Sequence, residues 1–403
     1  MKKLFFTLLL VFIVSISFSQ NLKKELDSLM FKSVNEGQLH GCVTYVQQRD
    51  KVLHFESYGF KNIEQNKKME NDVIFRIASM TKIITAAGAL KLYEEGKFLL
   101  DEPVKKYIPQ FNNLKVMQNI GTDSCKIVNL ERDITIRDLF RHTAGFGSGG
   151  ENDTIGNLYN KLDSAKTSED FLNTISQIPL RNQPGSKWEY SCSNKILGFL
   201  IEKIINKTLH DYLTESFFVP LGMTNTGFYV AKKNIDKLSC SYIYDEGKLK
   251  LEDNPMTSEY LKVPTIYNGG GGIVSTAKDL ANFYNMILHY GTFNGKQILK
   301  AQTVELLISN QIGEIKDRGI PDLTNILSKY RSFSVAGYGF GVGIHTEKNS
   351  GKTQSIYWAG SYNTYFLIDY DKQLITIFLT QITPFMHLDI MNKFGQIVNK
   401  NVH

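Results

Sequence analysis

The sequence predicts an α/β protein of the α+β type: one antiparallel sheet made from both ends of the chain, flanked by helices, with an inserted helical subdomain. Two observations support this prediction. Segments rich in β-branched and aromatic residues lie near both ends, at 41–60 and 337–382, whereas the pattern over about 99–260 is mostly that of helices and loops. The composition, 42% hydrophobic and 21% charged, is that of an ordinary globular protein.

The first residues resemble a secretory signal peptide. "MKK" precedes a short apolar run, and Ser17 and Ser19 stand at the right offsets for cleavage before Gln20. We therefore expect a signal peptide over 1–19, a mature domain over 20–403, and a periplasmic or secreted product. The alternative is an uncleaved anchor, but the apolar run is short for a bilayer span, and no second such run follows. We expect no stable membrane span after cleavage.

The elements at the N-terminal end follow in a simple order. A helix is predicted up to Gly37, because its apolar side chains recur on one face: Leu22, Leu26, Leu29 and Val34. Residues 41–60 then predict two strands around a polar turn at Arg49 and Asp50. A third segment, 79–95, predicts a helix that ends before Gly96.

The later elements are less regular. Thr135 and Asp138 have the spacing of a capping box, residues 194–218 form one long amphipathic stretch, and 275–291 predicts a helix. The strands of the last quarter are expected at 337–346, 355–361, 364–370 and 373–382, followed by a helix at about 386–400.

Several classes of function receive little support. There is no basic tract or Arg-rich helix, so nucleic acid is not an expected partner. The eight histidines form no H-E-x-x-H motif, and neither glycine-rich segment is followed by G-K-[ST], so we expect no metal and no cofactor. The cysteines form no C-x-x-C, and we expect mostly free, buried thiols at Cys42, Cys125, Cys192 and Cys240.

The spacing S-x-x-K occurs twice and is not specific by itself. One match, Ser275 and Lys278, follows the glycine run at 269–272. Thr276 and Asp279 have capping-box spacing there, so a helix start with an exposed lysine explains this match.

The other match, Ser79 and Lys82, precedes "IITAAGALKLYEE", whose first two turns carry no charge. Such a helix is expected to be buried, and its first lysine with it. Burial and the positive end of the helix dipole both favour the neutral amine, which can act as a base. Residues three apart share a helix face, so this amine can reach the Ser79 hydroxyl. A capped helix whose lysine extends into solvent is the alternative.

Five blocks of the chain, in this order, resemble the serine β-lactamase-related family. They are "FRIASMTKIITAAGALKLYEEGKFLLDEPVKKYIP", "ITIRDLFRHTAGF", "PGSKWEYSCSNKILGFLIE", "FFVPLGMTNTGF" and "GGGGIVSTAKDLANF". The family includes class C β-lactamases, D,D-peptidases and family VIII carboxylesterases. The resemblance covers the chain from about Leu22 to its end, and it implies the β-lactamase/transpeptidase-like fold.

The resemblance also implies roles for individual residues. Ser79 would be the nucleophile and Lys82 its partner, and Tyr190 of "YSCS" would move the proton to the leaving group. The backbone N–H groups of Ser79 and Ser361 would form the oxyanion hole. The residue types suit this chemistry, because a phenol has an unperturbed pKa of about 10 and needs a neighbouring lysine to become a useful base. A packed aromatic is the alternative for Tyr190.

Two positions depart from the family pattern. Cys192 stands where class C enzymes and most peptidases have Asn, and Trp358, Ala359 and Gly360 replace a motif that usually opens with Lys or His. Loss of this cation should weaken binding of a substrate carboxylate. W-x-G instead resembles family VIII carboxylesterases, so Cys192, Trp358 and Gly360 are expected to contact substrate.

Three further residues lie in or next to these blocks. His142 in "RHTAGF" is expected to be structural, and Asn194 and Lys195 either line the site or begin a helix.

The sequence therefore predicts an exported serine hydrolase acting through an acyl-enzyme on Ser79, with a small ester, amide or β-lactam as its substrate. A carboxylesterase or amidase is favoured. A β-lactamase or D-alanyl-D-alanine carboxypeptidase is the alternative with the same chemistry. A catalytically weak ligand-binding or sensor protein of the same fold is the alternative from another class.

Overall fold

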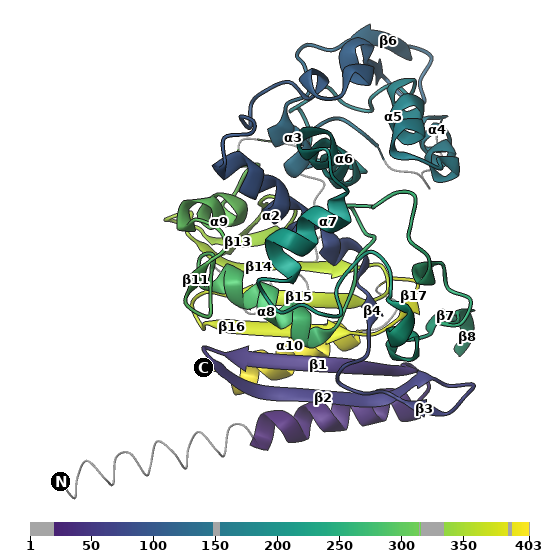
Figure 1. Cartoon of the computed structure of the whole chain (residues 1–403), viewed down its shortest axis with the longest axis vertical. Helices are drawn as coiled ribbons and strands as arrows, with labels where there is room; N and C mark the ends of the chain where they lie inside the picture. Colours follow the sequence, from purple (N-terminus) through teal and green to yellow (C-terminus); the bar gives the residue numbers. More distant parts are fainter. Residues whose placement is uncertain (1–19, 148–153, 314, 316–333, 386–388, 403) are drawn as a thin grey trace, which may run out of the picture.

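The computed structural model describes residues 20–147, 154–313, 315, 334–385 and 389–402 (Figure 1). The predicted signal peptide at 1–19 lies outside these residues. None of the helices within the described ranges is long and apolar enough to cross a membrane.

An eight-stranded antiparallel sheet forms the lower part of the molecule in Figure 1. Its spatial order is β12 (Ser334–Tyr338), β13 (Gly343–Glu347), β14 (Thr353–Gly360), β15 (Thr364–Asp369), β16 (Leu374–Leu379), β1 (Gly41–Gln48), β2 (Lys51–Asn62) and β3 (Lys67–Lys68). The two ends of the chain meet where β1 pairs with β16, with Val43 opposite Leu379. The predicted sheet from both termini is confirmed, and so is the turn between β1 and β2.

Helices cover both faces of this sheet, so β1 is buried on both sides along most of its length. On one face, a helix over 20–35 lies beside α10 (Ile390–Asn401), where Asn21 donates to Asn401 at 2.6 Å. On the other face lies α8 (Ala277–Leu288), whose Tyr284 ring stacks on Phe366 at 4.3 Å between centroids. This layered packing fixes the position of the strand ends near Ser79.

The part of the chain between α2 (Thr81–Glu94) and α8 lies mostly above the sheet in Figure 1. Its helices are α3 (Ile136–Phe140), α4 (Thr154–Tyr159), α5 (Ser168–Ser176), α6 (Ser193–Ile205) and α7 (Leu209–Leu213). The sequence missed two hairpins there, β5 (Lys115–Gln118) with β6 (Lys126–Asn129) and β7 (Ser241–Asp245) with β8 (Lys248–Asp253). All four strands are short, and β6 and β8 are largely exposed, so they carry little hydrophobic periodicity.

The structure divides one continuous amphipathic pattern, and one further expectation was wrong. The stretch 194–218 is not one helix, because Asn206 adopts a left-handed conformation (φ 53°) and ends α6, and Thr208 then caps α7. The segment 337–346 is not one strand. It leaves the sheet after β12, and the backbone N–H of Phe340 donates to the Leu307 carbonyl before β13 begins.

The cysteines are free, as expected, but not all are buried. Cys42 and Cys240 lie in the interior, Cys192 is partly exposed, and Cys125 is exposed.

Candidate active site

Ser79 lies where the chain turns from β4 (Phe75–Arg76) into α2, in the short 3-10 helix η1 (Ala78–Met80). The preceding Ala78 has a φ of 44°, in the left-handed region that residues with a Cβ rarely occupy. In the described stretch from Val73 to Leu90, every residue except Ser79 is buried. This turn therefore brings one hydroxyl to the surface of an otherwise buried segment.

The Ser79 hydroxyl lies between two polar side chains. Lys82 Nζ is 3.0 Å from Ser79 Oγ, and the Tyr190 hydroxyl is 2.7 Å from the same atom. Lys82 Nζ also lies 4.6 Å from the centre of the Tyr190 ring. The structure thus brings together the three residues that the resemblance singled out. A serine with two proton-carrying neighbours at hydrogen-bond distance can act as an activated nucleophile.

Lys82 is almost completely buried, and its amine has a third neighbour that the sequence did not indicate. The amine donates to the Gly270 carbonyl at 2.5 Å. Gly269 must be small, because a Cβ there would lie 2.9 Å from both the Asn194 carbonyl and the Thr85 side chain. The glycine run thus brings a carbonyl to Lys82, a contact that spacing alone could not indicate.

The ring of Tyr190 is held in an aromatic cluster. It lies 4.8 Å from the His142 ring, 6.3 Å from Trp188 and 5.6 Å from Trp358. These contacts fix the direction of the Tyr190 hydroxyl toward Ser79.

His142 has the structural surroundings that we expected. It is buried, and its Nδ1 accepts the backbone N–H of Ser191 at 3.2 Å, which places the ring proton on Nε2. Burial lowers the pKa of His142 well below its usual value, and the charge of Lys82 lowers this pKa further. A neutral imidazole therefore supports the segment that carries Tyr190.

The loop around His142 is anchored by Asp138. The predicted capping box with Thr135 is present, and the buried Asp138 carboxylate also accepts from Arg132 at 2.6 Å and Arg141 at 3.1 Å. Burial would raise the pKa of Asp138, but the hydrogen bonds from Arg132, Thr135 and Thr143 and the charge of Arg132 outweigh it and lower that pKa. The sequence indicated the helix cap but not this charge cluster.

The W-A-G motif ends β14 directly beside Ser79. Gly360 packs so closely that a Cβ would lie 2.5 Å from the Ile77 carbonyl and 3.1 Å from Ala78 Cβ. Ser361 follows at an exposed position. Trp358 is only 4% exposed, so much of its ring supports Tyr190. Contact of Trp358 and Gly360 with substrate, and the oxyanion role of Ser361, stay predictions.

Cys192 is the N-cap residue of α6. Burial raises the pKa of its thiol to about 12, so the sulfur is protonated at neutral pH. The two residues left undecided by the sequence lie in the first turn of α6. Asn194 is buried against α2, and Lys195 Nζ lies 4.2 Å above the Phe171 ring. Whether Cys192 touches substrate stays a prediction.

The second S-x-x-K match has a structural role. Ser275 is buried in β9 (Val274–Ser275), where its hydroxyl lies 2.7 Å from that of Thr226. Thr276 caps α8 by accepting from the Asp279 N–H at 3.1 Å. Lys278 is exposed. The helix-start explanation is confirmed.

Metal binding has no structural support in the part of the chain that the structure describes. No group of three or more His, Cys, Asp or Glu side chains is placed there to hold a metal ion.

Known proteins resemble the chain in sequence and in structure. Residues 24–396 match the family described as Beta-lactamase. Protein Rv1367c of Mycobacterium tuberculosis is 30% identical over 367 residues, which are 88% of each chain. Esterase EstB of Burkholderia gladioli is 29% identical over 219 residues, only 53% of each chain.

The solved structure of EstCE1, described as a hydrolase with promiscuous acyltransferase activity, superposes with a TM-score of 0.75. It is 22% identical and covers 94% of this chain and 99% of its own. These similarities confirm the predicted fold and the predicted family resemblance. The chain belongs to the β-lactamase family of serine hydrolases.

Proposed function

We propose that this protein is an exported serine hydrolase that forms an acyl-enzyme on Ser79 and cleaves small carboxylic esters or amides. One observation carries the proposal: the only surface hydroxyl of a buried segment lies within 3.0 Å of both Lys82 Nζ and the Tyr190 hydroxyl. A hydroxyl that only capped a helix would not need two such neighbours.

The proposed reaction has two steps. Ser79 Oγ attacks the carbonyl carbon of the substrate, and its proton passes to the Tyr190–Lys82 pair. Tyr190 then returns a proton to the departing alcohol or amine as the carbonyl–heteroatom bond breaks, which leaves Ser79 acylated. Water attacks the acyl group in the second step, the acid leaves, and Ser79 regains its proton.

The negative charge that develops on the carbonyl oxygen needs donors. We assign this role to the backbone N–H groups of Ser79 and Ser361. The close packing of Gly360 against Ala78 supports the assignment, because it holds the end of β14 beside η1. Loss of one such donor typically costs about 2.7–4 kcal/mol.

An ester or amide is favoured over an anionic substrate. Trp358 occupies the position of the expected cation, and the protonated Cys192 thiol is a weak hydrogen-bond partner. The esterase among the relatives supports the same choice. A β-lactamase or D-alanyl-D-alanine carboxypeptidase remains the alternative with the same nucleophile, and a weak ligand-binding or sensor protein the alternative without turnover.

Intact-mass measurement separates catalysis from binding alone. The mature protein is incubated with a fluorophosphonate and, separately, with a penicillin. We expect a covalent adduct that is lost in Ser79→Ala and kept in Ser275→Ala. A folded protein that forms no adduct would favour the sensor alternative, and an adduct lost only in Ser275→Ala would show that the other serine reacts.

Substrate class requires a rate comparison. We expect short p-nitrophenyl esters to be hydrolysed faster than a chromogenic cephalosporin, and the reverse order would favour the β-lactamase alternative.

Export is tested on the full-length chain expressed with its own N-terminus. An exported product that begins at Gln20 agrees with the proposal, whereas a cell-retained product that keeps residues 1–19 contradicts it.

A further inference from the structure

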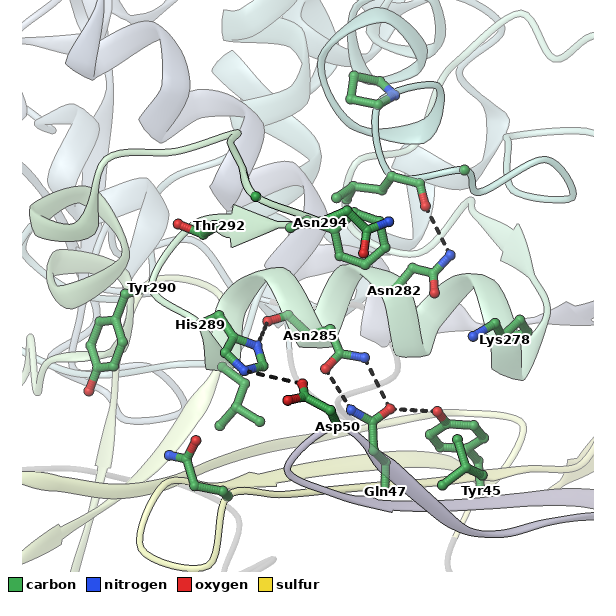
Figure 2. Close-up of a pocket in the computed structure, with 18 of the residues that line it drawn as sticks. Tyr45, Gln47, Asp50, Lys278, Asn282, Asn285, His289, Tyr290, Thr292 and Asn294 are labelled. Atoms are coloured by element: carbon green, nitrogen blue, oxygen red, sulfur yellow. Dashed lines mark hydrogen bonds and ion pairs between the residues drawn. The ribbon is translucent and has the colours of Figure 1, made fainter.

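A groove of about 1210 Å³ lies between α8, the β1–β2 turn, the loop at 219–222, and a small hairpin formed by β10 (Thr292–Phe293) and β11 (Lys296–Gln297) (Figure 2). Neither Ser79 nor its partners Lys82 and Tyr190 line it. The groove is therefore separate from the proposed acylation site, and the reaction gives it no role.

One wall of the groove is held by a fixed pair of amides. Gln47 of β1 donates to Asn285 Oδ1 at 2.7 Å, and Asn285 donates back to Gln47 Oε1 at 3.1 Å. Tyr45 also donates to Gln47 Oε1 at 2.6 Å (Figure 2). Gln47 is only 4% exposed, so this wall is formed before any ligand arrives.

Two other side-chain amides along the groove are held through their N–H groups, while their oxygens have no partner among the described residues. Asn282 donates to the Leu221 carbonyl at 2.9 Å, and Gln373 donates to the Tyr370 carbonyl at 3.1 Å. Within the described parts of the chain, the side-chain oxygens of Asn282 and Gln373 accept no hydrogen bond. Asn294 lies in the turn between β10 and β11 and also lines the groove (Figure 2). Two held amides, Asn282 and Gln373, and the exposed amide of Asn294 thus line one groove.

The charges around the groove nearly cancel. Asp50 and His289 lie 3.8 Å apart, and Lys278 stands at one end (Figure 2). The half-buried Phe293 ring and the exposed Tyr290 ring add flat apolar surface. One lysine at an end does not favour a polyanion, and the many amides do not favour an apolar ligand.

We propose that this groove binds a neutral oligosaccharide. Amide groups can pair with the hydroxyls of a sugar as both donors and acceptors, and an aromatic ring can pack on the apolar face of a pyranose. The volume exceeds the usual range of about 300–1,000 Å³ for small-molecule pockets, which suits several linked sugar units. Such a site would hold the enzyme on a glycan surface while Ser79 acts elsewhere.

The test measures binding on the full mature chain carrying Ser79→Ala, so the result does not depend on the proposed hydrolase activity. Chitohexaose, cellohexaose and maltohexaose are titrated separately by calorimetry. We expect at least one to bind with a Kd in the millimolar range or tighter. Asn282→Ala and Phe293→Ala should each weaken that binding by about tenfold. Asn112→Ala, an exposed asparagine outside the groove, is the matched control and should not change it.

Two outcomes overturn the proposal. One is that none of the three sugars binds at millimolar concentration. The other is that binding persists unchanged in both Asn282→Ala and Phe293→Ala, each shown by its unfolding curve to be folded. When Ser79 is left intact, the Asn282→Ala variant should hydrolyse p-nitrophenyl acetate at the parent rate, because the groove does not contact the reacting groups.

Discussion

The Tyr190 hydroxyl lies 2.7 Å from Ser79 Oγ, although 111 residues separate the two in sequence. Tyr190 precedes α6, and Ser79 precedes α2, so the contact depends on how these two helices pack. The rings of His142 and Trp358 hold the phenol in place from two other segments. The position of the hydroxyl is therefore fixed by packing, and its removal should affect chemistry more than folding.

Tyr190→Phe tests this directly. The ring contacts remain, so we expect an unfolding temperature close to that of the parent protein. The proton carrier is lost, so kcat for p-nitrophenyl acetate should fall by about 10²–10⁴-fold. Tyr229→Phe removes a hydroxyl from a partly exposed tyrosine that has no bond to Ser79 and serves as the control. An unchanged kcat in Tyr190→Phe would remove this residue from the mechanism.

Much of the fold was predictable from the sequence because long elements leave strong periodic patterns. The paired terminal strands and the helix after Ser79 are examples. The break at Asn206 was missed because the apolar pattern continues through it, and only the local left-handed conformation ends α6. The β5–β6 and β7–β8 hairpins were missed because all four strands are short and because β6 and β8 are mostly exposed.

The candidate site was predictable only in part. Spacing could not separate Ser79 from Ser275, whereas the ordered family blocks did. The Gly270 carbonyl next to Lys82 and the charges around Asp138 could not be read from sequence. Both depend on which backbone atoms and side chains the tertiary fold brings together. The large groove beside α8 gave no sequence signal, because its amides come from separate elements.

Gly360→Ala should disturb the site without changing any polar residue. The added Cβ would lie 2.3 Å from Thr364 Oγ1 and 2.5 Å from the Ile77 carbonyl, so β14 must move away from η1. Overpacking of this kind costs about 1–3 kcal/mol. We expect a lower unfolding free energy and slower fluorophosphonate labelling. Gly313→Ala is the control, because among the described atoms its Cβ would meet only the Asn310 amide, at 3.8 Å. Labelling at the parent rate would contradict the proposed packing.

Acid should destabilise the protein through its buried neutral histidines. His40 donates from Nδ1 to the Phe60 carbonyl and accepts the Gln381 N–H at Nε2, so a second ring proton would face an N–H. Burial lowers the pKa of His40 to about 4, and that of His142 also lies well below its usual value. The unfolded chain therefore binds more protons than the folded chain below pH 6.5 or so.

The folded-state pKa of both histidines lies below the unfolded value, so lowering the pH should reduce the free energy of unfolding. The contribution of each histidine to the free energy of unfolding is fully present above the unfolded pKa. It falls as the pH drops from about 6.5 toward 4, by at most about 1.4 kcal/mol per pH unit for each histidine. Urea unfolding at pH 7, 6 and 5 measures the slope. We expect His40→Gln to show a shallower loss than the parent protein over this range. An equal slope in both proteins would exclude His40 as a contributor.

Cys192→Asn tests why the site should favour esters. The Cys192 thiol is protonated and bonds weakly, whereas an asparagine there supplies the amide that class C enzymes and most peptidases carry at this position. We expect the ratio of kcat/KM for a chromogenic cephalosporin to that for p-nitrophenyl acetate to rise in Cys192→Asn. Cys192→Ser, which adds a smaller polar group, should raise the ratio less. A ratio that stays constant or falls while Ser79 still labels would mean that Cys192 does not set substrate preference, and that the cause lies with Trp358.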